Sequence, residues 1–83
     1  MKVILNQLIN IMIYCYIVDI EVSVPGKEPI MYQQYMRYIS IEKPLETVVK
    51  MDAVEKMKDI DGTKTAKSIL SISEEEYLNH TKE

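Results

Sequence analysis

The chain has 83 residues, a formal net charge of −3 at pH 7, 47% hydrophobic residues and 28% charged residues. This length predicts a single domain over 1–83, with 1–10 as a candidate peripheral extension, and the hydrophobic content argues against disorder. The acidic balance argues against a protein that binds nucleic acid through its charge, because such proteins present a basic face. A core this small is commonly supplemented by self-association or by a partner.

The first ten residues allow two interpretations, since their apolar residues have helical spacing whereas their β-branched content favours a strand. The apolar run over 3–18 is interrupted by Asn and Gln, lacks a small-residue cleavage site, and falls short of the ~20 residues that span a bilayer. We therefore expect neither a signal peptide nor a membrane anchor. Cys15 is the single cysteine, which excludes an intramolecular disulfide and fits a reducing, cytoplasmic location.

The strongest local pattern is an alternation over residues 12–24, which predicts a long strand. One face of this strand is apolar throughout: Met12, Tyr14, Tyr16, Val18, Ile20, Val22 and Val24. The opposite face changes from apolar to polar along its length: Ile11, Ile13, Cys15 and Ile17 are followed by Asp19, Glu21 and Ser23. The strand therefore has one face suited to a core and a second face that is half apolar.

A second strand is predicted over 30–41, joined to the first by a type II turn at Val24-Pro25-Gly26-Lys27. Proline fixes φ at the second turn position, and glycine accepts the positive φ required at the third. The alternation of this second strand is imperfect. We therefore expect either a β-bulge or a strand covered on both faces.

The second half of the chain predicts a helix, a strand and a short helix. Pro44 suits the first turn of a helix over 44–60, and Gly62 suits its C-terminal stop. The apolar stripe of this helix has helical spacing: Leu45, Val48, Val49, Ala53, Met57 and Ile60. A strand over 65–73 follows, and Ser73 with Glu76 has the form of a capping box for a helix over 74–80.

These elements predict an α+β fold of order β-β-α-β-(α), with a three-stranded sheet and one main helix packed on one face. The connections favour the strand order 2-1-3, with the third strand parallel to the second. The other face of the sheet would then expose a contiguous apolar patch, which monomers rarely do. We expect its residues to form a homodimer contact, the seat of the N-terminal segment or a partner site: Ile11, Ile13, Cys15 and Ile17.

Candidate catalytic groups are sparse. His80 is the single histidine, Cys15 lies in the middle of an apolar strand, and Asp19 with Glu21 marks the wet end of that strand. The acidic residues at 59–63 do not have the spacing of a calcium loop, and two glycines cannot build a phosphate loop. We therefore predict no catalytic residue, no metal site and no cofactor, and a protein that is not an enzyme.

Our leading hypothesis is a small protein-binding module that acts by direct contact and forms a homo-oligomer. Its size and composition resemble those of phage or mobile-element accessory proteins that inhibit host machinery, such as a CRISPR effector. The partner-binding candidates lie on the hairpin tip and the edge strand: Lys27, Glu28, Tyr35 and Arg37. The alternatives are a sheet that stacks single-stranded nucleic acid on its tyrosines, although the charge over 27–43 is only +1, and a small membrane-anchored protein.

Overall fold

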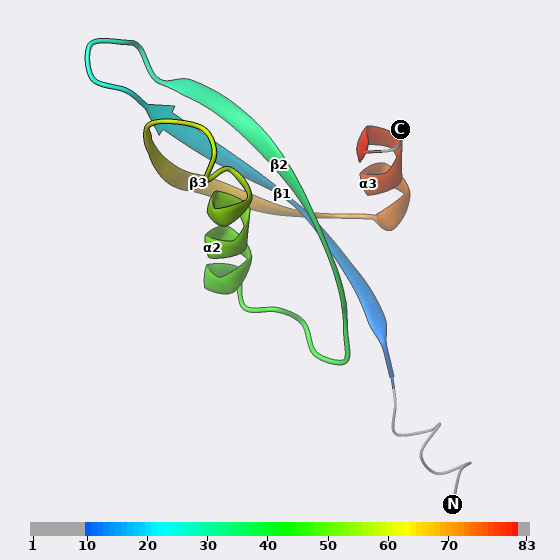
Figure 1. Cartoon of the computed structure of the whole chain (residues 1–83). Coiled ribbons are helices and arrows are strands. Elements are labelled where there is room, and N and C mark those ends of the chain that lie inside the picture. Colours follow the sequence, from blue (N-terminus) through cyan, green and yellow to red (C-terminus); the bar gives the residue numbers. More distant parts are fainter. Residues whose placement is uncertain (1–9, 82–83) are drawn as a thin grey trace, which may run out of the picture.

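A computed structural model describes residues 10–81, which form a three-stranded antiparallel sheet and two helices (Figure 1). The elements are β1 (Met12–Ser23), β2 (Ile30–Ser40), α2 (Glu46–Lys56), β3 (Thr63–Ile72) and α3 (Glu74–Thr81). The α+β class and the order of the elements are as the sequence predicts. The interpretations offered for residues 1–9 lie outside the described residues.

The strand order is β2-β1-β3, so the long first strand is central and β2 runs parallel to β3, as predicted. The hairpin ladder runs without interruption from Met12 opposite Ser40 to Val22 opposite Ile30. The imperfect alternation of β2 therefore reflects a strand that is partly covered on both faces. The predicted type II turn is present, because Lys27 N donates to Val24 O at 3.1 Å and Gly26 has φ of 80°.

A register shift interrupts the β1–β3 ladder between Asp19 and Ile20. Asp19 lies opposite Ser68 and Ile20 lies opposite Ala66, so Lys67 is an extra residue on β3. This bulge restores the alternation of β3, so that Ile69 and Ala66 both lie on the core side of the sheet. The sequence pattern alone gave no indication of it.

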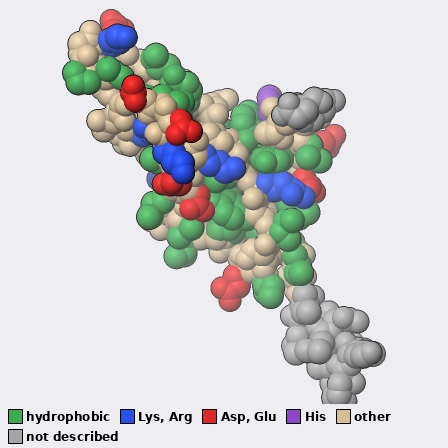
Figure 2. Space-filling view, viewed as in Figure 1, with side chains coloured by type: hydrophobic (Ala, Val, Ile, Leu, Met, Phe, Trp, Pro, Cys, Tyr) green, Lys and Arg blue, Asp and Glu red, His purple; other side chains and the backbone are tan. Residues whose placement is uncertain are grey.

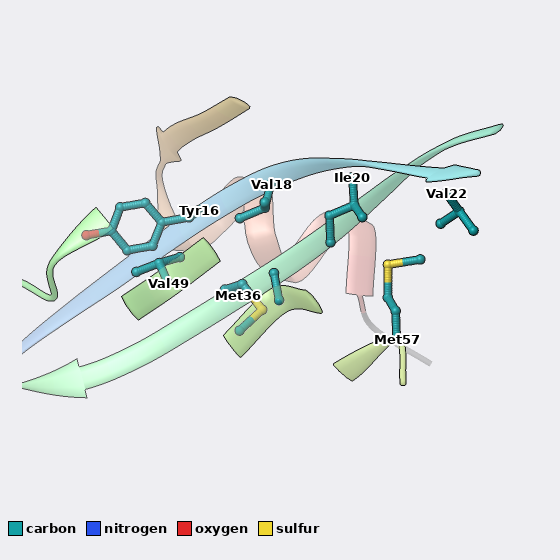
Figure 3. Close-up of a cluster of buried hydrophobic side chains, with 8 residues drawn as sticks. Tyr16, Val18, Ile20, Val22, Met36, Val49 and Met57 are labelled. Atoms are coloured by element: carbon teal, nitrogen blue, oxygen red, sulfur yellow. The ribbon is translucent and has the colours of Figure 1, made fainter. Parts of the chain in front are cut away.

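The core forms between α2 and the even-numbered face of β1, where Figure 3 shows a row of β1 side chains over the helix. Its buried members are Tyr16, Val18, Ile20, Val22, Met36, Val49, Ala53 and Met57. The alternation therefore identifies the buried face from Tyr16 to Val22, whereas Met12 at the start of the strand is 48% exposed. Fully burying an aliphatic side chain of this size stabilises the fold by about 1.5–3 kcal/mol.

The helix α2 is shorter than the predicted span of 44–60. Leu45 is the N-cap, with an extended backbone (φ −70°, ψ 141°), so Pro44 lies outside the helix. At the other end the chain tightens into hydrogen bonds between residues three apart, such as Lys58 N to Glu55 O. The predicted apolar stripe is also too wide, because Leu45 is 70% exposed and Val48 is 43% exposed.

Gly62 does not end the helix, contrary to the prediction. It precedes β3 with φ of 124°, where a Cβ atom would lie 2.8 Å from Val22 Cγ1 and 2.9 Å from Ser23 O. A glycine is required here because the chain enters β3 in close contact with the end of β1. The requirement is therefore tertiary, whereas the prediction assumed a local helix stop.

The helix α3 begins where the capping-box pattern places it. Glu76 N donates to Ser73 Oγ at 3.1 Å, and Tyr77 N donates to Ser73 O at 3.1 Å. Figure 1 shows α2 and α3 on opposite sides of the sheet. The second face of the sheet is therefore partly covered, although the sequence predicted it to be open.

Candidate interaction surface

The odd-numbered face of the sheet is closed around Cys15 by α3. Arg37, which lies opposite Cys15 in the ladder, donates from Nη2 to Glu74 Oε2 at 2.9 Å and from Nε at 3.2 Å. Near the other end of α3, His80 stacks on the ring of Tyr35, with the ring centroids 5.1 Å apart. These two contacts fasten both ends of α3 to β2.

Cys15 is 2% exposed beneath this cover. Burial raises the pKa of its thiol, the charge of Glu74 raises it further, and the charge of Arg37 opposes this effect. A thiol with a raised pKa and no access to solvent is a poor nucleophile. Cys15 therefore acts as a buried packing residue.

The four residues predicted for self-association fall into two groups. Ile11 and Ile13 are 57% and 42% exposed, whereas Cys15 is buried and Ile17 is half-buried. The expectation that all four lie open is wrong for Cys15, because α3 covers it. The capping box at Ser73 located this helix, but no local pattern states over which face the chain turns after β3.

Beyond α3 the hairpin continues as a two-stranded ribbon, since β3 pairs with β1 only from Cys15 onwards. We call residues 11–14 and 38–41 the isoleucine arm. Its exposed isoleucines are all on the odd-numbered face and are 42–61% exposed: Ile11, Ile13, Ile39 and Ile41. Neither segment of the arm contains a charged residue. Figure 2 shows hydrophobic and uncharged atoms over this part of the molecule.

The arm is an unusual surface for an isolated chain. A two-stranded ribbon has marginal stability in water, and monomers rarely expose a contiguous apolar patch. Moreover, residues 12–14 of β1 have no strand beside them on the β3 side within the described part of the chain. Their backbone groups on that side are available to an extended segment.

The predicted partner-binding residues are not brought together. Lys27 and Glu28 lie exposed in the hairpin turn, whereas Tyr35, the middle residue of β2, and Arg37 hold α3. Glu28 and Tyr35 are seven positions apart along largely extended chain, which is roughly 20 Å or more. The first pair remains a candidate surface at the hairpin tip, and the second pair has an internal structural role.

The other candidate groups are engaged in structural contacts. Ser68 Oγ donates to Asp19 Oδ2 at 2.8 Å, and Lys67 Nζ lies 3.4 Å from Glu21 Oε1. Residues 10–81 contain no group of three or more His, Cys, Asp or Glu side chains placed to hold a metal ion. The described hairpin tyrosines are buried or half-buried, which leaves little ring surface for stacking bases.

One shallow groove lies between α2 and β3. Its lining is mainly apolar but includes two charged side chains: Lys50, Met51, Val54, Glu55 and Ala66. The groove is open to solvent and lacks converging polar groups, so it does not resemble a small-molecule site. None of the helices within 10–81 is long and apolar enough to cross a bilayer.

Comparison of this chain with protein-family models, with curated proteins and with solved structures finds no match. Among the surfaces of residues 10–81, the isoleucine arm is the most distinctive.

Proposed function

We propose that the protein is a small, non-enzymatic binding module that acts by direct contact with another protein through the isoleucine arm. One observation carries this proposal: four half-exposed isoleucines lie on one face of an uncharged ribbon that extends beyond the cover of α3. Water contact with that surface is unfavourable, and a protein partner with an apolar face would remove it.

The available energy is moderate. Complete burial of an isoleucine contributes about 1.5–3 kcal/mol, and roughly half of that remains available at each half-exposed side chain. Four such side chains together offer about 3–6 kcal/mol before the entropic cost of association, so apolar contact alone gives weak binding. Backbone pairing along residues 12–14 would supply direction and additional affinity. The arm therefore favours a partner that presents an extended, apolar segment.

A narrower prediction is that the protein is an accessory protein of a phage or mobile element and inhibits host machinery. It rests on small size and composition, and the surfaces described above do not narrow the partner to that class. It stays a prediction. A cytoplasmic location likewise stays a prediction.

The proposal is tested by affinity capture with tagged protein, followed by binding measurements with the captured partner. The test variant is the double substitution Ile13→Lys and Ile41→Lys, which places two ammonium groups on the arm. The control is Leu45→Lys with Met51→Lys, at residues that are 70% and 69% exposed in and beside α2. Circular dichroism verifies that both variants are folded.

We expect the arm variant to lose at least about tenfold in affinity, because a charge must be desolvated against an apolar partner surface. The control variant should bind as the parent chain does. Equal binding by both variants would show that the arm is not the contact surface, and failure to capture any specific partner would count against the binding function itself.

A further inference from the structure

The two edges of the sheet are built differently. β3 carries Lys64 and Lys67, and the bulge at Lys67 breaks the regular spacing of its edge. β2 is an uninterrupted strand of 11 residues without Gly or Pro, and Arg37 is its one charged residue. That guanidinium group is held by Glu74 of the same chain.

Lysines and bulges are the usual devices that prevent a sheet edge from pairing with another strand. The β3 edge has both devices, whereas the β2 edge has neither. A long, regular and nearly uncharged edge exposes a row of backbone N–H and C=O groups. These groups form hydrogen bonds either with water or with another strand. Among residues 10–81, the order β2-β1-β3 leaves that row without a strand partner.

We propose that the β2 edge pairs antiparallel with the β2 edge of a second copy of this chain. The resulting dimer would have a continuous six-stranded sheet with the order β3-β1-β2-β2-β1-β3. A two-fold axis perpendicular to the sheet relates the two copies. This inference goes beyond the proposed function, because the occupant is a second copy of the chain and the contact is the backbone edge of β2, which shares only Tyr38, Ile39 and Ser40 with the isoleucine arm.

The sequence of β2 is complementary to itself in this arrangement. Tyr35 is the middle residue, and an axis beside it pairs all eleven residues while keeping like faces together. Tyr32 then lies opposite Tyr38 of the second copy, which is a favourable aromatic pair. Met31 lies opposite Ile39 of the second copy. Within one chain these two residues are 57% and 61% exposed, so the pairing covers both.

Neighbouring registers fit less well. An axis at Gln34 leaves Ile39 and Ser40 without partners, and it places Met31 opposite Arg37 of the second copy. An axis at Met36 leaves Ile30 and Met31 outside the ladder. The Tyr35-centred register is therefore the one in which the ladder is longest and the exposed apolar residues at the two ends of β2 meet.

Sedimentation equilibrium of the full chain tests the proposal. Met31→Lys and Ile39→Glu each set a charge against an apolar side chain at two symmetry-related contacts, so each should raise the dimer dissociation constant at least about tenfold. The double variant sets the new cation opposite the new carboxylate of the second copy. It should return the dissociation constant to within about threefold of the parent value.

This rescue is specific to the interface, because Met31 and Ile39 are eight positions apart on one extended strand within each copy. Both positions are exposed, so the fold should survive, and circular dichroism checks this. Ser71→Lys on the opposite edge is the control and should leave the dimer unchanged.

If the chain were monomeric at about 500 µM, the proposal would be overturned, because even a weak dimer would be substantially populated at that protein concentration. Dissociation by Ser71→Lys would instead assign the contact to β3. If Ile39→Glu abolishes the dimer and the double variant does not restore it, the dimer contact would be assigned to the isoleucine arm. Because Met31 lies outside the arm, the result for Met31→Lys is independent of whether the arm captures a different protein.

Discussion

Two tyrosines of the core region contact each other, but only one of them forms a hydrogen bond through its hydroxyl group. The rings of Tyr16 and Tyr38 are in edge-to-face contact, with centroids 6.2 Å apart and an interplanar angle of 70°. The hydroxyl of Tyr38 donates to Asp52 Oδ2 at 2.7 Å. The hydroxyl of Tyr16 is buried and has no hydrogen-bond partner among the described residues. Replacing each tyrosine with phenylalanine removes the hydroxyl and keeps the ring.

The two substitutions should change stability in opposite directions. A buried hydroxyl without a partner costs about 1–3 kcal/mol in lost hydration, so Tyr16→Phe should raise the free energy of unfolding by about 1 kcal/mol. Tyr38→Phe removes a hydrogen bond to a charged acceptor and should lower it by about 1–2 kcal/mol. For a domain of this size, 1 kcal/mol corresponds to about 4–8 °C in melting temperature.

Urea unfolding followed by far-ultraviolet circular dichroism measures both changes, because the chain contains no tryptophan. The slope of the unfolding free energy with urea should be the same for all three proteins. A loss of more than about 0.5 kcal/mol in Tyr16→Phe would refute the reasoning, because it would mean that this hydroxyl makes a stabilising hydrogen bond.

Three further predictions concern the two glycines, the pH dependence of stability and the cover of Cys15. Gly62→Ala should lower the free energy of unfolding by about 2 kcal/mol or more, because its Cβ would meet Val22 at 2.8 Å. Gly26→Ala should lower the free energy of unfolding by only about 1 kcal/mol, because the positive φ of Gly26 is strained for alanine but none of the described atoms lies within 4 Å of the added Cβ. Equal losses in the two variants would contradict the close contact at Gly62. Burial, followed by the hydrogen bond to Asp52, raises the pKa of Tyr38, and burial raises that of the Cys15 thiol. The folded state therefore keeps the thiol and phenol protons that the unfolded chain loses near pH 8.5 and 10. The urea midpoint should be constant near pH 7 and fall above about pH 8.5. A constant midpoint up to pH 11 would contradict these pKa shifts. A chain that ends after residue 73 lacks α3, and its Cys15 should react with a disulfide reagent at least about tenfold faster than in the full chain; an unchanged rate would show that α3 is not the cover.

The sequence by itself determined the features that depend on local spacing. The alternation over 12–24 identified the central strand and its buried face, since side chains of a strand point to opposite faces in turn. The type II turn at Gly26 and the cap at Ser73 were predictable because their hydrogen bonds join residues three positions apart. The strand order followed from connection rules and from the apolar character of β1.

Only the tertiary structure decided the features that depend on distant segments. Cys15 is buried because α3 turns back over the odd-numbered face, and that choice of face is fixed by Arg37 with Glu74 and by Tyr35 with His80. The ends of α2 also differ from the prediction, because the helix begins after the extended N-cap Leu45, and Met57 and Ile60 contact the core from the turn that follows Lys56. The contacts of Arg37 with Glu74 and of Tyr35 with His80 join residues tens of positions apart. No periodic pattern within one segment could predict them. The isoleucine arm is defined in the same way, as the part of the hairpin that neither β3 nor α3 reaches.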